Sequence, residues 1–177
     1  MYGFGAMVPP VRHRASHCFA VNGDIFNPEV DGLEGVIEAY KTAIQTLKLS
    51  GPTHFAQVIK MVADMAESER VSQANQKYFI LLLITDGIIN DMQKTIDEIV
   101  RASSLPLSII IVGVGNEDFS SMERLDADVD PLYSQAHKKT MERDIVQFVP
   151  FLEFKDNPLM LAKETLNEVP KQLLSYF

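Results

Sequence analysis

The stretch Tyr78-Phe79-Ile80-Leu81-Leu82-Leu83-Ile84-Thr85-Asp86-Gly87 decides the fold class of this chain. Seven apolar residues follow one another without a charge and end at a Thr-Asp-Gly turn signal. A run of this kind predicts a strand over Tyr78–Thr85 that is buried on both faces, as in a parallel sheet covered by helices. Ligands of such sheets bind at the carboxyl ends of the strands, so Asp86 is the first candidate functional residue.

Helical and strand patterns alternate on both sides of this strand. Apolar residues recur at helical spacing in one stripe after Asp31, namely Leu33, Val36, Ile37, Tyr40, Ile44 and Leu47. Further helices are predicted from near His54, over Met92–Ser103, over Ser121–Leu125, and from Asn157-Pro158 to a break at Pro170. Buried strands are predicted at Leu107–Val114 and Ile145–Val149. This order predicts a single α/β domain over residues 1–177, with a mostly parallel, doubly wound sheet and helices on both faces.

The N-terminal region and the connections have weaker patterns. We expect strands at Met1–Val8 and Cys18–Val21, with loops at Val11–Ser16, Ser68–Lys77 and Asp126–Lys139. Helix starts are predicted from capping patterns, namely Asp31 with Glu34, Ser120 with Glu123, and single N-caps at Asp91 and Asn157.

Composition limits the function classes. The formal net charge of −8 argues against a nucleic-acid surface, which needs clustered Lys and Arg, and against electrostatic attachment to anionic lipid. The single cysteine, Cys18, excludes an internal disulfide and suits a reducing compartment. The apolar runs are shorter than a membrane span, and Met1–Gly5 lacks the pattern of a secretion signal. A cytoplasmic location is therefore expected.

Two predicted loops end on oxygen-bearing side chains, Thr53 after Gly51-Pro52 and Asp86 after Thr85. If both loops lie at the same edge of the sheet, Thr53 and Asp86 can share a hard cation such as Mg²⁺ or Mn²⁺. The residues alone leave plainer alternatives open. Thr53 also suits a helix N-cap, and Asp86 also suits a turn.

Other motifs favour structural roles. The acidic series Asp126, Asp128 and Asp130 lacks the glycine and the glutamate that an EF-hand loop requires, because Pro131 and His137 stand there. The pair Gly113-x-Gly115 lacks the third glycine of a dinucleotide fingerprint. His13 and His17 are four apart without a helical pattern, and Cys18 has no evident base nearby, so a zinc pair and a reactive thiol are both disfavoured.

Several motifs together resemble the C-terminal domain of copines. They are Tyr2-Gly-Phe-Gly-Ala6, Gly51-Pro-Thr53, Ile84-Thr-Asp-Gly87, Ile110-Ile-Val-Gly-Val-Gly115 and Arg143-Asp-Ile-Val-Gln-Phe-Val-Pro-Phe151. The resemblance covers nearly the whole chain and implies a three-layer, von Willebrand factor A-like fold. It also implies a metal-ion-dependent adhesion site with Thr53 and Asp86 as ligands, completed by an acidic group of a protein partner.

The resemblance has one departure. The family's site also uses an Asp-x-Ser/Thr-x-Ser motif after the first strand, and no such motif stands before Tyr2. We therefore expect an N-terminally truncated domain with an incomplete metal site. The C2 domains that give copines calcium-dependent phospholipid binding are also missing, so recruitment to the plasma membrane is expected only of the parent protein.

Three functions follow as hypotheses. The first is a non-enzymatic protein-interaction module that uses Mg²⁺ or Mn²⁺ at Thr53 and Asp86. The second is a metal-free scaffold with a vestigial site. The third is a metal- or nucleotide-dependent enzyme, for which the sequence offers no convincing nucleophile and base around Asp86.

Overall fold

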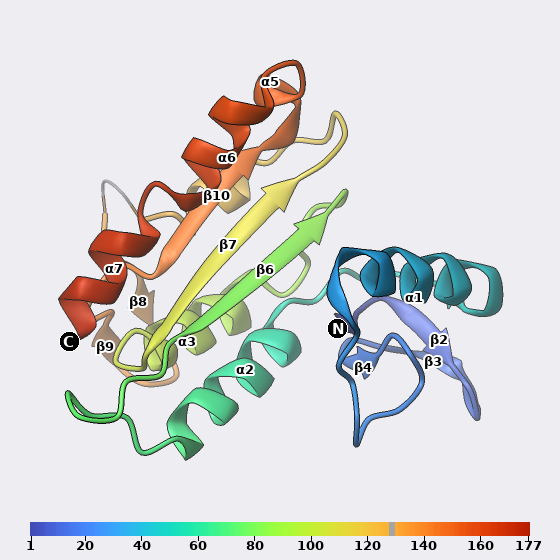
Figure 1. Cartoon of the computed structure of the whole chain (residues 1–177), viewed down its shortest axis with the longest axis horizontal. Helices are drawn as coiled ribbons and strands as arrows, with labels where there is room; N and C mark the ends of the chain where they lie inside the picture. Colours follow the sequence, from blue (N-terminus) through green and yellow to red (C-terminus); the bar gives the residue numbers. More distant parts are fainter. Residues whose placement is uncertain (128–129) are drawn as a thin grey trace. The chain divides into compact units, whose positions relative to one another are not determined.

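The structure is a computed structural model of the chain and describes residues 1–127 and 130–177. Its contacts divide the chain into two compact units, Met1–Val58 and Ile59–Phe177 (Figure 1). The boundary falls inside helix α2 (Ala56–Ser68). The single domain over residues 1–177 therefore stays a prediction.

The first unit contains short antiparallel strands and one long helix. Its elements are β1 (Tyr2–Gly3), β2 (Ala6–Val8), β3 (Val11–Ser16), β4 (Phe19–Ala20), α1 (Gly32–Thr46) and β5 (Lys48–Leu49). Strand β1 pairs with β4, and β2 lies between β3 and β5, all antiparallel.

Two predictions for this unit were wrong. The expected strand Met1–Val8 is interrupted at Gly5, whose φ of +69° ends regular strand geometry. Residues Val11–Ser16, expected as a loop, form strand β3 of a hairpin with β2. A strand that lies at the edge of a small sheet is held by backbone hydrogen bonds, so polar side chains such as His13 and Arg14 can remain exposed there.

Helix α1 exposes the apolar stripe that the sequence predicts. Leu33, Val36, Ile37, Tyr40 and Ile44 are all exposed, and the buried residue of this helix is Ala43. The helix itself is confirmed, but its apolar face does not form core in the described structure.

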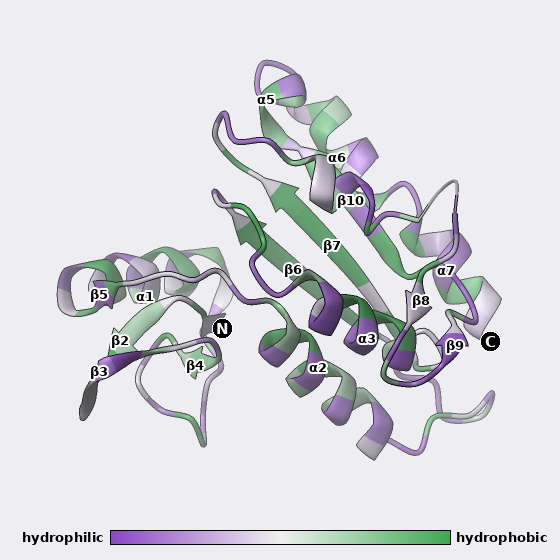
Figure 2. Cartoon of the chain, turned by 180° about the vertical axis from the view of Figure 1, so that it is seen from behind, coloured by the Kyte–Doolittle hydropathy of each residue, from purple (hydrophilic) through white to green (hydrophobic). Residues whose placement is uncertain are grey.

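The second unit is built around a parallel sheet. Among the described residues, its strands are β6 (Phe79–Thr85), β7 (Leu107–Gly113) and β10 (Val146–Pro150), in the order β10-β7-β6, and both pairs are parallel. The predicted parallel sheet is thus confirmed. In Figure 2 these strands are the most continuous hydrophobic elements of the unit.

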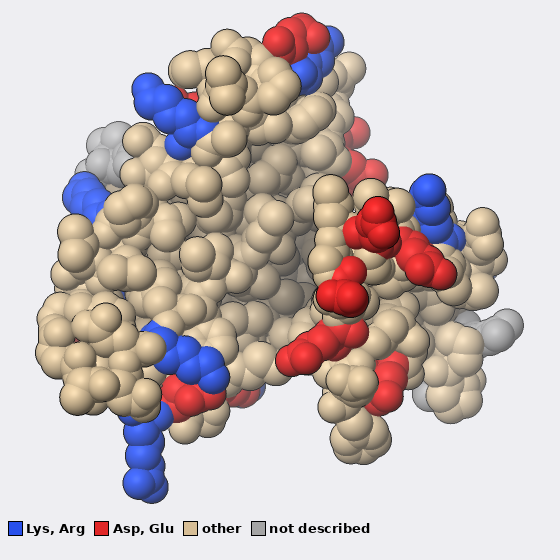
Figure 3. All heavy atoms as spheres, in the orientation of Figure 1, with Lys and Arg blue, Asp and Glu red and all other residues tan. Residues whose placement is uncertain are grey.

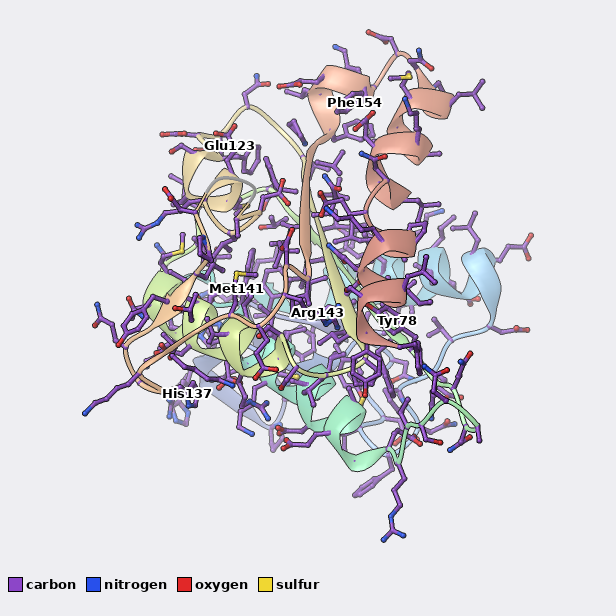
Figure 4. The ribbon with its side chains drawn as sticks, turned by 90° about the vertical axis from the view of Figure 1, so that its left-hand side faces the viewer. Tyr78, Glu123, His137, Met141, Arg143 and Phe154 are labelled. Atoms are coloured by element: carbon purple, nitrogen blue, oxygen red, sulfur yellow. The ribbon has the colours of Figure 1, made fainter. Side chains whose placement is uncertain are left out.

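Helices and a short hairpin surround this sheet. They are α3 (Met92–Ala102), α4 (Ser120–Glu123), β8 (Tyr133–Ser134), β9 (Lys139–Thr140), α5 (Phe151–Phe154), α6 (Pro158–Leu166) and α7 (Val169–Tyr176). Figure 4 shows α6 and α7 along one side of β7 and β10, and α3 along the other. Fully buried side chains such as Ile99 of α3, Ile109 and Ile111 of β7, and Val146 of β10 form the core.

Strand β6 differs from its prediction in one respect. Ile80, Leu82 and Ile84 are 52%, 52% and 58% exposed, whereas Leu83 and Thr85 are buried. In the described part of the chain β6 is an edge strand, with β7 on one side and no strand on the other. Burial on both faces therefore holds for β7 and was wrong for β6.

The helix ends show which capping predictions were right. Asn157 caps α6, because its Oδ1 accepts a hydrogen bond from Met160 N at 3.1 Å, and Pro170 lies in the first turn of a separate helix, α7. Asp31 and Asp91 stand at N-cap positions but make no capping hydrogen bond there. Helix α4 begins at Ser120 itself, so the Ser120 capping box was wrong. The Oδ1 of Asp118 instead accepts from Ser120 N at 3.0 Å.

Candidate functional site

Asp86 lies where the sequence analysis places it, just after the last residue of β6. Thr85 anchors this end of the strand. Its carbonyl oxygen accepts from Val114 N at 2.8 Å, and its Oγ1 accepts from Gly87 N at 3.3 Å. The Asp86 side chain is exposed, so its carboxylate is accessible at the carboxyl end of a parallel strand. This is the position at which α/β sheets bind ligands.

Thr53 belongs to the first unit and is half-buried. Its loop is held beside the break between β1 and β2, where Ser50 N donates to Gly5 O at 2.8 Å. The next residue, His54, packs its ring against His17 with 4.3 Å between ring centroids. Helix α2 begins at Ala56, so Phe55, not Thr53, stands immediately before it. This position disfavours the alternative that Thr53 is only a helix N-cap.

Thr53 and Asp86 thus lie in different compact units, and their sharing of one cation stays a prediction. Within residues 1–127 and 130–177, no group of three or more His, Cys, Asp or Glu side chains is arranged to hold a metal ion. The oxygen chemistry of Thr53 and Asp86 suits Mg²⁺ or Mn²⁺, with water or a partner supplying further ligands.

The other acidic candidates have structural contacts. The carboxylate of Asp91 accepts from Thr95 Oγ1 at 3.2 Å within the first turn of α3. The carboxylate of Asp126 accepts from Phe148 N at 3.1 Å, which ties its loop to β10. Asp128 lies outside the described residues, so the predicted calcium alternative is not described as a whole.

The remaining candidates also fit structural roles. A Cβ at Gly113 would lie 3.0 Å from the Phe119 ring, so close ring packing explains this glycine without a nucleotide. His17 is buried against His54, whereas His13 is exposed on β3. Partial burial raises the pKa of the Cys18 thiol, which keeps it protonated and disfavours a nucleophilic role.

Sequence reasoning missed the part played by Arg143. Its guanidinium lies over the rings of Tyr78 and Tyr176, at 6.0 and 5.4 Å from their centroids. It donates to the carbonyl oxygens of Leu107 and Gln172 at 3.0 Å each, and also to that of Leu105. Figure 4 shows Arg143 and Tyr78 beside α7. The signal that could have found it is an arginine directly before a buried strand, in the longest of the motifs quoted above.

The fold and the exposed carboxylate define the class as an α/β protein with a candidate ligand site at the carboxyl edge of a parallel sheet. The copine family model matches residues 1–177, and the chain belongs to the copine family. Membership implies a copine-like protein involved in protein interaction. None of the helices in the described ranges combines the length and the apolar character needed to cross a membrane.

Proposed function

We propose that this chain is a non-enzymatic protein-interaction module with a von Willebrand factor A-like, three-layer fold. It binds Mg²⁺ or Mn²⁺ through Thr53 and Asp86, and the metal binds an acidic group of a protein partner. The observation that carries the proposal is the exposed Asp86 carboxylate at the carboxyl end of β6, in a chain of the copine family.

The residues have distinct roles in this proposal. The Asp86 carboxylate supplies the negative charge for the cation, and the Thr53 hydroxyl supplies a neutral oxygen ligand. When bound, the metal would supply a positive charge that a partner's carboxylate can ligate. The hydrogen bonds of Thr85 hold the end of β6 in place, so Asp86 can be replaced without disturbing the strand.

Paramagnetic broadening by Mn²⁺ in a proton–nitrogen NMR spectrum tests the site in the chain as it stands. We expect Mn²⁺ to broaden the amide signals around both Thr53 and Asp86, and Mg²⁺ to reverse the effect by competition. Asp86→Ala should abolish the broadening at both positions with an unchanged fold by circular dichroism.

Glu117→Ala is the matched control, since Glu117 is another exposed carboxylate, in the loop after the neighbouring strand β7. It should leave the broadening around Asp86 intact. Broadening that survives in Asp86→Ala, or that affects Asp86 without Thr53, would show that the proposed pair is not the site. Partner binding that is insensitive to chelation of the metal would favour the metal-free scaffold.

A further inference from the structure

The open edge of β6 is an unused interaction surface. Hydrogen bonds from Phe79 N to Pro106 O and from Val114 N to Thr85 O fix which backbone groups point toward β7. Because these groups alternate along a parallel strand, Phe79, Leu81, Leu83 and Thr85 pair with β7. The N–H and C=O groups of Ile80, Leu82 and Ile84 therefore point to the open side, where no described strand pairs with them.

The same three residues present apolar side chains. Ile80 is in register with Ser108, whose Oγ donates to Gln172 Oε1 of α7 at 2.6 Å, so Ile80, Leu82 and Ile84 lie on the face of the sheet that α7 covers farther along. All three are more than half exposed. Figure 3, which views the molecule from this side, shows few charged atoms over β6 and β7. The edge thus combines free backbone groups with an apolar stripe and no charge.

We propose that this edge binds the β6 strand of a second copy of the chain, antiparallel and centred on Leu82, so that the two sheets become continuous across a two-fold axis. In this register Leu82 faces Leu82 of the second copy, and Ile80 faces Ile84. All of these residues point their N–H and C=O groups outward, so each opposed pair exchanges both hydrogen bonds. Opposed aliphatic side chains on the same face stabilise such pairs.

The charges at the two ends of β6 favour the antiparallel arrangement with a second copy. Lys77 precedes the strand and Asp86 follows it, with no charge between them. Pairing centred on Leu82 places Lys77 opposite Gly87 of the second copy, next to its Asp86, and the same contact recurs at the other end. Lys77 also pairs with Glu69 but keeps about half of its side chain exposed. A two-fold contact of this kind is closed and does not extend into a fibre.

Sedimentation velocity over a concentration series tests the proposal. One edge strand per copy buries less than the roughly 1,200–2,000 Å² of stable complexes, so we expect a reversible dimer with a Kd on the order of 0.1 mM. Leu82→Lys should weaken dimerisation at least tenfold, because it places a charge on the edge in each copy. Leu159→Lys, at an 84% exposed position on α6, is the matched control and should leave the dimer unchanged.

The two variants should keep the far-ultraviolet circular dichroism of the original chain. A chain that stays monomeric up to about 1 mM, well above the expected Kd, would overturn the proposal and leave the edge to an extended peptide of another protein. A dimer that folded Leu82→Lys leaves intact, or that both variants weaken equally, would also overturn it.

Cysteine cross-linking tests the register and does not depend on the lysine variant. In a Cys18→Ser background, Leu82→Cys brings two thiols opposite each other, with Cβ atoms about 5 Å apart, and should cross-link rapidly. Two Ile80→Cys residues would lie four residues apart along the strands, about 14 Å, and should not cross-link with each other. A mixture of Ile80→Cys and Ile84→Cys chains should cross-link. Equal cross-linking of Leu82→Cys and Ile80→Cys would show non-specific association and overturn the register.

Discussion

At the scale of single residues, Arg143 joins three parts of the second unit. Its planar guanidinium reaches carbonyl oxygens before and within β7 and in α7, and it lies over two tyrosine rings. The fully buried Leu107 would leave its carbonyl without this charged donor if the arginine were removed. Lysine cannot replace this fork of donors, because it presents a single ammonium group.

We therefore predict that Arg143→Met lowers the free energy of unfolding by about 2–4 kcal/mol, since it leaves buried carbonyl oxygens without a donor. Urea denaturation monitored by circular dichroism measures the change. Lys139→Met is the control, because Lys139 forms an exposed 3.4 Å ion pair with Glu142. It should cost less than about 1 kcal/mol. Similar losses in both variants would contradict the role of Arg143.

At the scale of secondary-structure elements, the β8–β9 hairpin is attached to α3 through one carboxylate. The Oδ1 of Asp97 accepts from Ser134 Oγ at 2.6 Å and from Ala136 N at 3.4 Å, and Ser134 is fully buried. Partial desolvation raises the pKa of Asp97, but the hydrogen bonds from Ser134, Ala136 and Gln93 outweigh it, so the pKa is lowered on balance.

A lowered pKa in the folded state means that the ionised carboxylate stabilises the fold above the unfolded-state pKa of about 3.9, and that this contribution is lost as the pH falls through the folded-state value. Asp97→Asn should lower stability at pH 7 by about 1 kcal/mol and reduce the loss of stability on acidification. Denaturation midpoints measured between pH 7 and pH 2 check this. An unchanged pH dependence in Asp97→Asn would exclude Asp97 as its source.

At the scale of the whole molecule, net charge opposes the tendency of exposed apolar surfaces to associate. The chain carries 24 acidic and 16 basic residues, whereas large apolar side chains are exposed on α1, β6, α6 and α7. Charge repulsion keeps such molecules apart at neutral pH and disappears near the isoelectric point of about 4.9. We expect light scattering to increase several-fold toward pH 5 and to fall again on further acidification. A maximum near pH 7 would contradict this expectation.

How much the sequence reveals differs between elements. The helix positions, the parallel strands and the exposed Asp86 follow from local patterns, because apolar spacing and turn residues act within a few positions of the chain. The strand at Val11–Ser16 escaped prediction because its pairing depends on β2 and not on its own side chains. The pairing of Thr53 with Asp86 also lies beyond local pattern, because it depends on how segments far apart in the chain meet.

The sequence by itself therefore determined the α/β class, the resemblance that the family match bears out, and the candidate carboxylate. The tertiary structure decided which apolar residues are buried. Leu81, Leu82 and Leu83 are identical in chemistry, yet Leu83 is buried and Leu82 is half exposed. The physical reason is that burial depends on what packs against each face and each edge of a strand, and an apolar run carries no information on its neighbours.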